Sequence, residues 1–341
     1  MSRSVDSGSE RPEASEREKG RAAAIDCGTN SIRLLVADLD PAAGTLTDLD
    51  RRMRIVRLGQ GVDRTGRLAP EALERTFAAC REYAEVIREH GVPADRVVFA
   101  ATSATRDAEN RDEFVRGVVD ILGVAPEVIT GDQEAAFSFT GATRELTAAD
   151  GLVSPYLVVD IGGGSTEFVL GDRAVTAARS VDIGCVRLTE RHLLRDGRLA
   201  DPPTPEQVAA IRADVDAALD EAAGAVPLDR ARTLVGLAGS VTTVAGIALG
   251  LPRYDSAAIH HSRVPLETVR DITDRLLAAT HAERAAIPVM HEGRVDVIAA
   301  GALILLRIME RTGAKEVVVS EHDILDGLAW GVIGEAGPTA G

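Results

Sequence analysis

Cysteine is scarce in this chain of 341 residues, which contains only Cys27, Cys80 and Cys185. Their spacing contains no C-x-x-C pair, so the sequence predicts neither a disulfide framework nor a zinc site. Apolar runs are short as well: none approaches the roughly 20 residues of a membrane span, and the amino terminus has no signal-peptide core. We therefore expect a soluble protein of the reducing cytoplasm.

Basic residues are outnumbered, with 38 Lys and Arg against 53 Asp and Glu, and the net charge is −15. This balance argues against binding to nucleic acid or to an anionic membrane, because both need clustered positive charge. A polyanionic ligand remains compatible with it if backbone amides, a few arginines and a bound cation hold the phosphates locally. Two catalytic signatures are also missing. There is no Walker A loop, and without a G-x-S-x-G elbow a Ser-His-Asp hydrolase is disfavoured.

The sequence does contain one loop twice. Residues 26–31 read DCGTNS and residues 160–165 read DIGGGS, so both follow the pattern D-x-G-x-x-S. Each is preceded and followed by a short, mostly apolar run, which predicts a strand, a glycine-rich turn and a second strand. Glycines let the backbone turn tightly and let an anion approach the N–H groups. Two unrelated hairpins would be the simpler explanation of one copy, but two copies in one register favour a duplicated phosphate-binding element.

The rest of the chain predicts an α/β protein in which helices flank mixed sheets. Residues 1–20 have few apolar side chains and are expected to be a disordered tail. We place one domain at 21–143 and a second at 144–341, with the boundary near 142–155. The last helix, at 324–332, could pack on either domain. The other expected strands are 22–26, 32–39, 52–57, 96–102, 127–130, 157–159, 166–171, 179–183, 233–237 and 317–319, and the other expected helices are 70–89, 111–122, 134–143, 205–223, 266–279, 295–310 and one that opens at 239–243.

Four acidic residues and one arginine are candidates for chemistry. Glu134 opens a helix between the two turns, where it could deprotonate a water for attack on phosphorus, or could simply complement the helix dipole. Asp160 and Glu167 flank the second turn and offer the hard oxygens that Mg²⁺ prefers, although an Asp can also merely cap a turn. Asp26, the counterpart of Asp160, is ambiguous in the same way. Arg106 follows a strand end and could clamp a phosphate.

Backbone amides offer further anion contacts. Gly163 and Gly164 belong to the second turn, and the segment around Cys185 follows it closely. Gly239 and Ser240 open a helix, whose first N–H groups face outward and can bind an anion.

Together, these motifs resemble the exopolyphosphatase / guanosine pentaphosphate phosphatase (Ppx/GppA) family, over roughly residues 22–333. The ordered segments that carry the resemblance are IDCGTNSIRLLV, ATSATRDAEN, ITGDQEAAFSFTGA, VVDIGGGSTEFVL, SVDIGCVRLTER and LAGSVTTVA. The family belongs to the sugar kinase, Hsp70 and actin superfamily, so the resemblance implies two ribonuclease H-like domains with a cleft between them.

The resemblance also implies roles for particular residues. Glu134 would be the catalytic base, and Asp160 and Glu167 would support a metal, expected to be Mg²⁺, and the attacking water. The phosphate ligands would be Asn30, Ser31, Arg106, Ser165 and the amide around Cys185. Gln133 stands where many members have a second acid.

The implied activity is hydrolysis of the terminal phosphate of polyphosphate, in a protein that is often a homodimer. Longer members append a helical domain for which a chain ending at Gly341 leaves no room, which favours short polyphosphates. Three alternatives stay open: a phosphohydrolase that converts pppGpp to ppGpp, a kinase of the same superfamily, and a polyphosphate or alarmone sensor without turnover.

Overall fold

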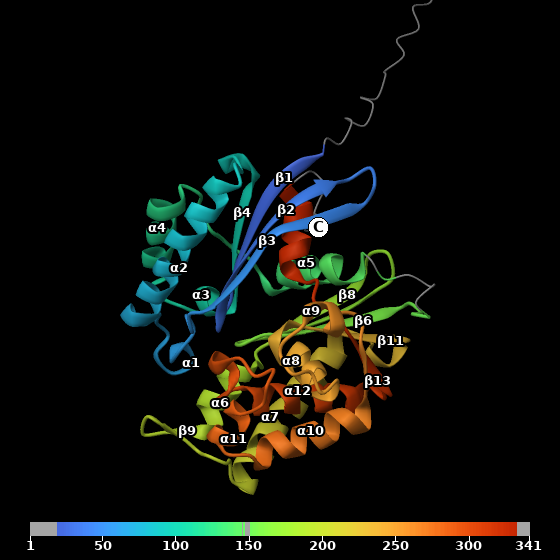
Figure 1. Cartoon of the computed structure of the whole chain (residues 1–341). Coiled ribbons are helices and arrows are strands. Elements are labelled where there is room, and N and C mark those ends of the chain that lie inside the picture. Colours follow the sequence, from blue (N-terminus) through green and yellow to red (C-terminus); the bar gives the residue numbers. More distant parts are fainter. Residues whose placement is uncertain (1–18, 145, 147–150, 333–341) are drawn as a thin grey trace, which may run out of the picture.

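The computed structural model describes residues 19–144, 146 and 151–332, and its strands form two large sheets, one above the other in Figure 1. The expected tail at 1–20 falls almost wholly outside the described residues, but β1 already begins at Gly20, so the tail was predicted slightly too long. Part of the expected domain boundary, at residues 145 and 147–150, also lies outside the described residues. Within the described ranges, no helix is long and apolar enough to cross a membrane.

The first sheet has the strand order β3-β2-β1-β4-β5. β1 runs antiparallel to β2 and parallel to β4, and β2 and β3 are antiparallel. The elements of this half are β1 (Gly20–Cys27), β2 (Ser31–Asp40), β3 (Thr45–Ile55), α1 (Val62–Thr65), α2 (Pro70–Glu89), η1 (Ala94–Arg96), β4 (Val97–Ala101), α3 (Ser103–Arg106), α4 (Arg111–Leu122), β5 (Glu127–Val128) and α5 (Gly131–Thr143).

The second sheet has the order β12-β13-β11-β6-β7-β8, which repeats the first from the other end with one extra edge strand. β6, β7 and β8 are antiparallel neighbours, and β11 is parallel to β6 and to β13. The elements are β6 (Tyr156–Ile161), β7 (Thr166–Gly171), β8 (Val175–Val181), α6 (Cys185–Leu193), β9 (Leu194–Arg195), β10 (Arg198–Leu199), α7 (Pro205–Ala225), η3 (Leu228–Arg230), β11 (Thr233–Leu237), α8 (Ala238–Ala248), α9 (Ser256–Ile259), β12 (Arg263–Pro265), α10 (Leu266–Ala278), α11 (His281–Ala285), η4 (Glu292–Arg294), α12 (Ile298–Thr312), β13 (Glu316–Val319) and α13 (Ile324–Val332).

This duplicated arrangement, with three antiparallel strands followed by parallel ones, is the ribonuclease H-like topology that we expected. Both glycine-rich turns connect antiparallel strands, as predicted: one joins β1 to β2 and the other joins β6 to β7. They are closed in the same way, because the N–H of Gly28 donates to the carbonyl of Ser31 at 2.9 Å and that of Gly162 donates to the carbonyl of Ser165 at 3.0 Å. The two turns are therefore the same structure built twice.

Each sheet buries one face against its own helices. In the first half, alternate residues of the strands, such as Ile25 and Leu34, pack on α2 and α4. In the second half, Leu157 and Val159 face a larger core built with α7, α8, α10 and α12. Alternation along each strand then sends Ala24 and Val158 to the opposite faces, which need another cover.

Two helices cover these faces, and each packs on the sheet of the other half of the chain. α5, which follows the first sheet, packs on the second sheet, where Phe139 contacts a cluster that includes Val158. The last helix, α13, packs back on the first sheet, where Leu328 and Trp330 contact a surface rich in alanine. The two helices also contact one another, and they lie between the sheets in green and red in Figure 1.

Close approach of α5 and α13 depends on two glycines. A Cβ added to Gly141 would lie 1.8 Å from the carbonyl oxygen of Asp323, and one added to Gly327 would lie 2.1 Å from that of Phe137. Both helices therefore meet backbone to backbone. This crossing joins the two halves of the molecule through closely packed backbone.

Several boundaries differ from the predicted ones. β3 begins at Thr45, although we expected this strand at 52–57. It is an edge strand whose side chains are mostly exposed, so it lacks the apolar alternation that marks a half-buried strand. Helix α6 was not predicted, because it is short and directly follows a glycine, Gly184.

Candidate active site

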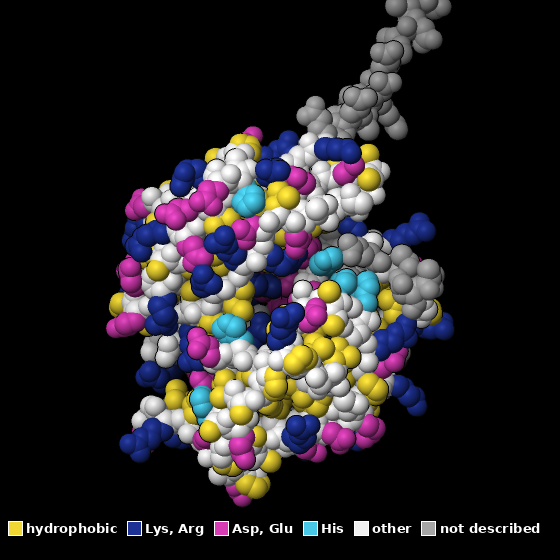
Figure 2. All heavy atoms as spheres, viewed as in Figure 1, with side chains coloured by type: hydrophobic (Ala, Val, Ile, Leu, Met, Phe, Trp, Pro, Cys, Tyr) yellow, Lys and Arg dark blue, Asp and Glu magenta, His cyan; other side chains and the backbone are white. Residues whose placement is uncertain are grey.

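The two glycine-rich turns meet across the space between the sheets. A Cβ added to Gly163 would lie 3.3 Å from the amide nitrogen of Asn30, and one added to Gly164 would lie 2.7 Å from Oγ1 of Thr29 and 2.6 Å from Oγ of Ser103. Only glycine fits such a contact. Figure 2 shows a hollow between the two halves of the molecule, with acidic and basic side chains inside it.

A cavity of about 100 Å³ lies between the turns and collects most of the predicted site residues. The predicted residues that line it are Asp26, Asn30, Ser31, Glu134, Asp160, Gly163, Ser165, Cys185, Gly239 and Ser240. Arg106, Gly164 and Glu167 do not line its surface. Arg106 and Glu167 lie behind lining residues, and Gly164 faces the opposite side of the turn, in a small pocket with Arg187.

Carbonyl groups of each turn are bound from outside by the segment that follows the third strand of the same sheet. In the first half, the N–H groups of Val56 and Arg57 donate to the carbonyl of Asn30 at 3.0 and 2.8 Å. In the second, the N–H groups of Cys185 and Val186 donate to the carbonyls of Gly162 and Gly163 at 3.0 and 2.9 Å. These bonds fix the carbonyls and leave the N–H groups on the inner side of the turns available for an anion.

One prediction is corrected by these bonds. We expected the backbone amide around Cys185 to hold phosphate, but the N–H of Cys185 already donates to a carbonyl of the second turn. Since a backbone N–H is a single donor, the first turn of α6 supports the phosphate-binding turn instead of contacting the phosphate. Cys185 still lines the cavity.

Glu134 lies in the first turn of α5, which begins with a capping box between Thr130 and Gln133. Gln133 thus has a local role at the start of the helix, because its Oε1 accepts from the N–H of Thr130 at 2.9 Å. The Glu134 side chain is 12% exposed and its Oε2 lies 3.3 Å from a guanidinium nitrogen of Arg106. Arg106 also donates to the carbonyl of Ile129 at 2.8 Å, which fixes its direction.

Glu134 is held where its proton affinity is high. Burial raises its pKa well above the usual range, the nearby Glu167 carboxylate raises it further, and Arg106 opposes both effects. A carboxylate with a raised pKa is a stronger base once it has lost its proton. Geometry and proton affinity therefore both fit a general base beside the cavity.

The two copies carry different charges at equivalent positions. In the second copy, Asp160 on β6 lies directly opposite Glu167 on β7, so two acids face one another across an antiparallel pair. In the first copy, Asp26 lies directly opposite Arg33, whose guanidinium binds it at 2.6 Å. Like charges in this arrangement repel and opposite charges attract. The negative charge of Asp26 is therefore neutralised by the residue opposite it, whereas Asp160 faces a second acid.

Burial and neighbouring carboxylates raise the pKa values of both acids. Burial, with the carboxylate of Asp323 nearby, raises the pKa of Asp160 to about 6, although a hydrogen bond from Ser138 Oγ at 2.7 Å lowers it in part. Burial and Asp160 raise the pKa of Glu167 to about 8, against a hydrogen bond from Ser180 Oγ at 2.7 Å. A bound cation would relieve this repulsion.

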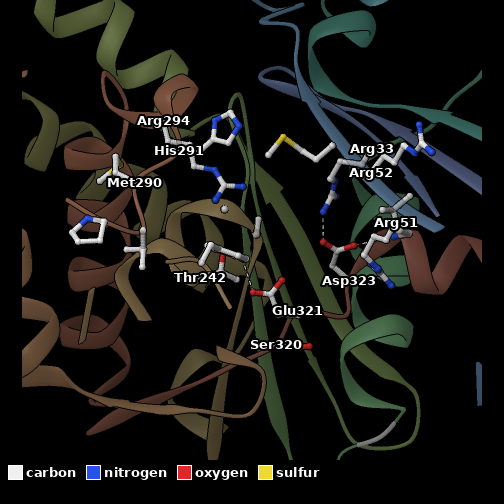
Figure 3. Close-up of a pocket in the computed structure, with 17 residues that line it drawn as sticks. Arg33, Arg51, Arg52, Thr242, Met290, His291, Arg294, Ser320, Glu321 and Asp323 are labelled. Carbon is white, nitrogen blue, oxygen red and sulfur yellow. Dashed lines mark hydrogen bonds and ion pairs between the residues drawn. The ribbon is translucent and has the colours of Figure 1, made fainter. Parts of the chain in front are cut away.

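A second cavity, of about 430 Å³, opens beside the first and shares part of its wall, including Arg33 and Arg294. Figure 3 shows Arg33 and Arg294 on opposite sides of it, with Arg51 and Arg52 further along the wall. The wall of this cavity also includes Met53, Tyr254, Val289, Met290 and His291.

The sequence analysis missed Arg33, Arg294 and Asp323. Arg33 had a visible signal, because it is a charged residue inside an otherwise apolar strand next to the first turn. It binds Asp323, which is 290 positions away, and no local pattern marks that partner. Arg294 lies flat against Gly239, where an added Cβ would be 2.5 Å from its Cζ, and only the folded chain brings the two together.

Fold and site together define an α/β protein with two ribonuclease H-like sheets, whose duplicated turns face one another across a cleft. The sequence profile of the Ppx/GppA phosphatase family matches residues 35–334. The chain therefore belongs to the Ppx/GppA phosphatase family.

Individual relatives agree with this assignment. Exopolyphosphatase 2 of Mycobacterium tuberculosis (strain H37Rv) is 51% identical over 325 residues, which cover 92% of this chain and 99% of that protein. The crystal structure of an exopolyphosphatase-like protein is 44% identical with a TM-score of 0.85, covering 92% of this chain and 97% of the other. The Ppx/GppA family member from Aquifex aeolicus is 31% identical with a TM-score of 0.75, covering 94% and 99%.

Proposed function

We propose that this protein is an exopolyphosphatase that releases the terminal phosphate of inorganic polyphosphate by attack of a water molecule. The observation that carries the proposal is that Glu134 lines the same small cavity as both glycine-rich turns. A terminal phosphate bound to the turns would have this carboxylate beside its phosphorus. The 51% identical relative from Mycobacterium tuberculosis bears the name exopolyphosphatase, which supports this choice within the family.

In this proposal each residue has a distinct task. The amides of Asn30 and Gly163 and the hydroxyl groups of Ser31 and Ser165 hold the non-bridging oxygens of the terminal phosphate, and Gly164, which was also expected to do so, faces away from the cavity. Gly239 and Ser240 add the amino-terminal end of α8, where helical N–H groups favour an anion. Glu134 accepts the proton of the attacking water, and Arg106 orients Glu134. General base catalysis of this kind contributes about 10²- to 10⁴-fold to the rate.

We further propose that Asp160 and Glu167 hold Mg²⁺ together with the substrate. Among the described residues, no group of three or more His, Cys, Asp or Glu side chains could hold a metal ion by itself. Mg²⁺ is usually bound through one or two carboxylates and substrate phosphates, so an acidic pair fits it. Asp26, also expected as a ligand, is instead ion-paired with Arg33. When bound, Mg²⁺ would neutralise charge on the phosphates.

Metal binding can be tested without turnover. Calorimetric titration of Mg²⁺ into the Glu134→Gln enzyme with tripolyphosphate should show a binding isotherm that Asp160→Asn and Glu167→Gln weaken. Because both acids have raised pKa values, the binding should also release protons to the buffer near neutral pH. Unchanged Mg²⁺ affinity in both variants would refute the assignment of these ligands.

The proposed activity is tested with a panel of pyrophosphate, tripolyphosphate, longer polyphosphates and pppGpp, each with Mg²⁺. We expect orthophosphate release from polyphosphate, and a loss of about 10²- to 10⁴-fold in kcat for Glu134→Gln. Asp132→Asn is the matched control, because Asp132 is an exposed acid in the same helical turn. Absence of orthophosphate release with any divalent metal, or equal activity of both variants, would refute the proposal.

The second cavity favours a pppGpp phosphohydrolase as the alternative activity. A nucleoside could lie against Met53, Tyr254, Val289 and Met290 while the arginines of the wall bind its phosphates. A relative from Aeromonas hydrophila, 29% identical over 313 residues that cover 92% of this chain and 59% of that protein, is named guanosine-5′-triphosphate,3′-diphosphate pyrophosphatase. The ratio of kcat/KM for pppGpp and tripolyphosphate ranks the two activities.

Two further expectations accompany the proposal. Sedimentation velocity should show the homodimer that the resemblance implies, and fractionation should place the protein in the cytoplasm. Tight polyphosphate binding without turnover would instead identify a sensor.

A further inference from the structure

We propose that Arg187 is a positioning residue that couples the shape of the second phosphate-binding turn to closure of the cleft. The hydrogen bonds of this side chain reach from the turn to the opposite half of the molecule, and the side chain does not line the cavity of the candidate active site. Its effect on phosphate hydrolysis rests on the proposed function, whereas its effect on closure does not.

The carbonyl groups of the second turn, residues 162–165, are not all bound in the same way. The backbone N–H groups of α6 bind the carbonyls of Gly162 and Gly163. The carbonyl of Gly164 is bound differently, by Nε of the Arg187 side chain at 2.7 Å. Since Gly164 has no side chain to restrain it, this bond holds the peptide plane whose other end is the N–H of Ser165. Arg187 therefore orients the part of the turn that faces the phosphate.

The same guanidinium group also binds the opposite half of the molecule. Its two terminal nitrogens bind Asp63 on α1 and Asp107 at the end of α3, each at 2.6 Å. Both aspartates belong to the first half of the molecule, and the Arg187 side chain is only 13% exposed. One rigid planar group thus donates to the second-half turn and to two carboxylates of the first half.

The contact between Arg187 and Asp107 lies next to the contact between Arg106 and Glu134. Asp107 directly follows Arg106, whose guanidinium lies 3.3 Å from Glu134. α3 therefore presents one residue to the candidate base and the next to Arg187. Thr29 and Ser103, which hydrogen-bond to one another at 2.9 Å, lie against Gly164 at the same place. Separating the two halves would remove both of these carboxylates from Arg187 and would leave its guanidinium only the longer contact of 3.7 Å with Asp182 of the second half, so the Gly164 carbonyl would be held less firmly.

Kinetics of three variants test this coupling. We expect Arg187→Met to raise KM for tripolyphosphate about 10- to 100-fold, the effect of losing a hydrogen bond to a charged group, with a smaller fall in kcat. Arg187→Lys should restore only part of the loss, because one ammonium cannot reach all three acceptors in a plane. Asp107→Asn should lie between wild type and Arg187→Met, because Asp63 still binds Arg187.

The matched control is Arg270→Met, which removes an arginine that binds two glutamates within the second half alone. This variant should keep the wild-type KM. A KM for Arg187→Met equal to that of Arg270→Met would overturn the proposal, as would full rescue by Arg187→Lys.

Hydrogen exchange of the substrate-free protein tests closure independently of activity. Arg187→Met should increase exchange at 59–66 and 103–108 in the first half as well as at 162–171 in the second, and Arg270→Met should leave all three segments unchanged. An increase confined to α6 would mean a local structural role and would overturn the proposal. If the wild-type protein hydrolyses no polyphosphate but exchange changes as expected, the proposed function fails while the coupling stands.

Discussion

Replacing Glu167 with glutamine should stabilise the metal-free protein at high pH and leave its stability almost unchanged at low pH. Folding raises the pKa of Glu167 from 4.5 to about 8, because the side chain is buried and lies opposite Asp160. Between these two values the folded protein binds the proton more tightly than the unfolded protein does. The free energy of unfolding therefore falls as pH rises through this interval.

The size of the effect follows from the shift. Each pH unit within the interval costs about 1.36 kcal/mol, so about three units, from about pH 5 to about pH 8, cost about 4 kcal/mol. Glutamine has no proton to lose, and its carbonyl oxygen can still accept the hydrogen bond from Ser180, which is 2.7 Å long in the wild-type protein. The stability of Glu167→Gln relative to wild type should therefore improve by about 4 kcal/mol across this range.

Urea denaturation in EDTA at several pH values measures this difference. Glu221→Gln is the control, because Glu221 is a half-exposed residue of the same domain whose partner is the surface residue Arg179. Its stability relative to wild type should vary by less than about 1 kcal/mol. Mg²⁺ with phosphate should reduce the advantage of Glu167→Gln, since a cation favours the charged wild-type side chain. Parallel pH profiles for wild type and Glu167→Gln in EDTA would refute this account of the acidic pair.

Two other predictions test the crossing of α5 and α13 and the acidic pair. Gly141→Ala should lower the free energy of unfolding by about 2–3 kcal/mol, because the new Cβ would meet the backbone of Asp323 on α13. Gly224→Ala, in a helix with nothing within 4 Å of the added Cβ, should raise it by about 0.5–1 kcal/mol, and equal urea midpoints for the two variants would contradict the backbone contact. Ser138→Ala removes a hydrogen bond that lowers the pKa of Asp160, so the pKa of this carboxyl group in the metal-free protein, measured by NMR, should move up by about one unit; an unmoved pKa would contradict the role of Ser138 in lowering it.

The sequence alone was sufficient for the features that depend on neighbours in the chain. Both turns follow from a repeated D-x-G-x-x-S pattern with apolar flanks, and α2 (Pro70–Glu89) follows from its helical spacing of apolar residues. Glu134 was found because it follows a strand and opens a helix. Local backbone preferences and side-chain periodicity suffice for such elements.

Only the tertiary structure decided which charges meet. Asp26 and Asp160 look equivalent in the sequence, but Arg33 stands opposite one and Glu167 opposite the other. Contacts between distant segments also decide three other features. They are the packing of α13 on the first sheet, the hydrogen bond from the Cys185 amide to the second turn, and the hydrogen bonds from Arg187 to the first half. The physical reason is that a turn is specified by its own residues, whereas the partner of a buried charge is specified by packing of the whole chain.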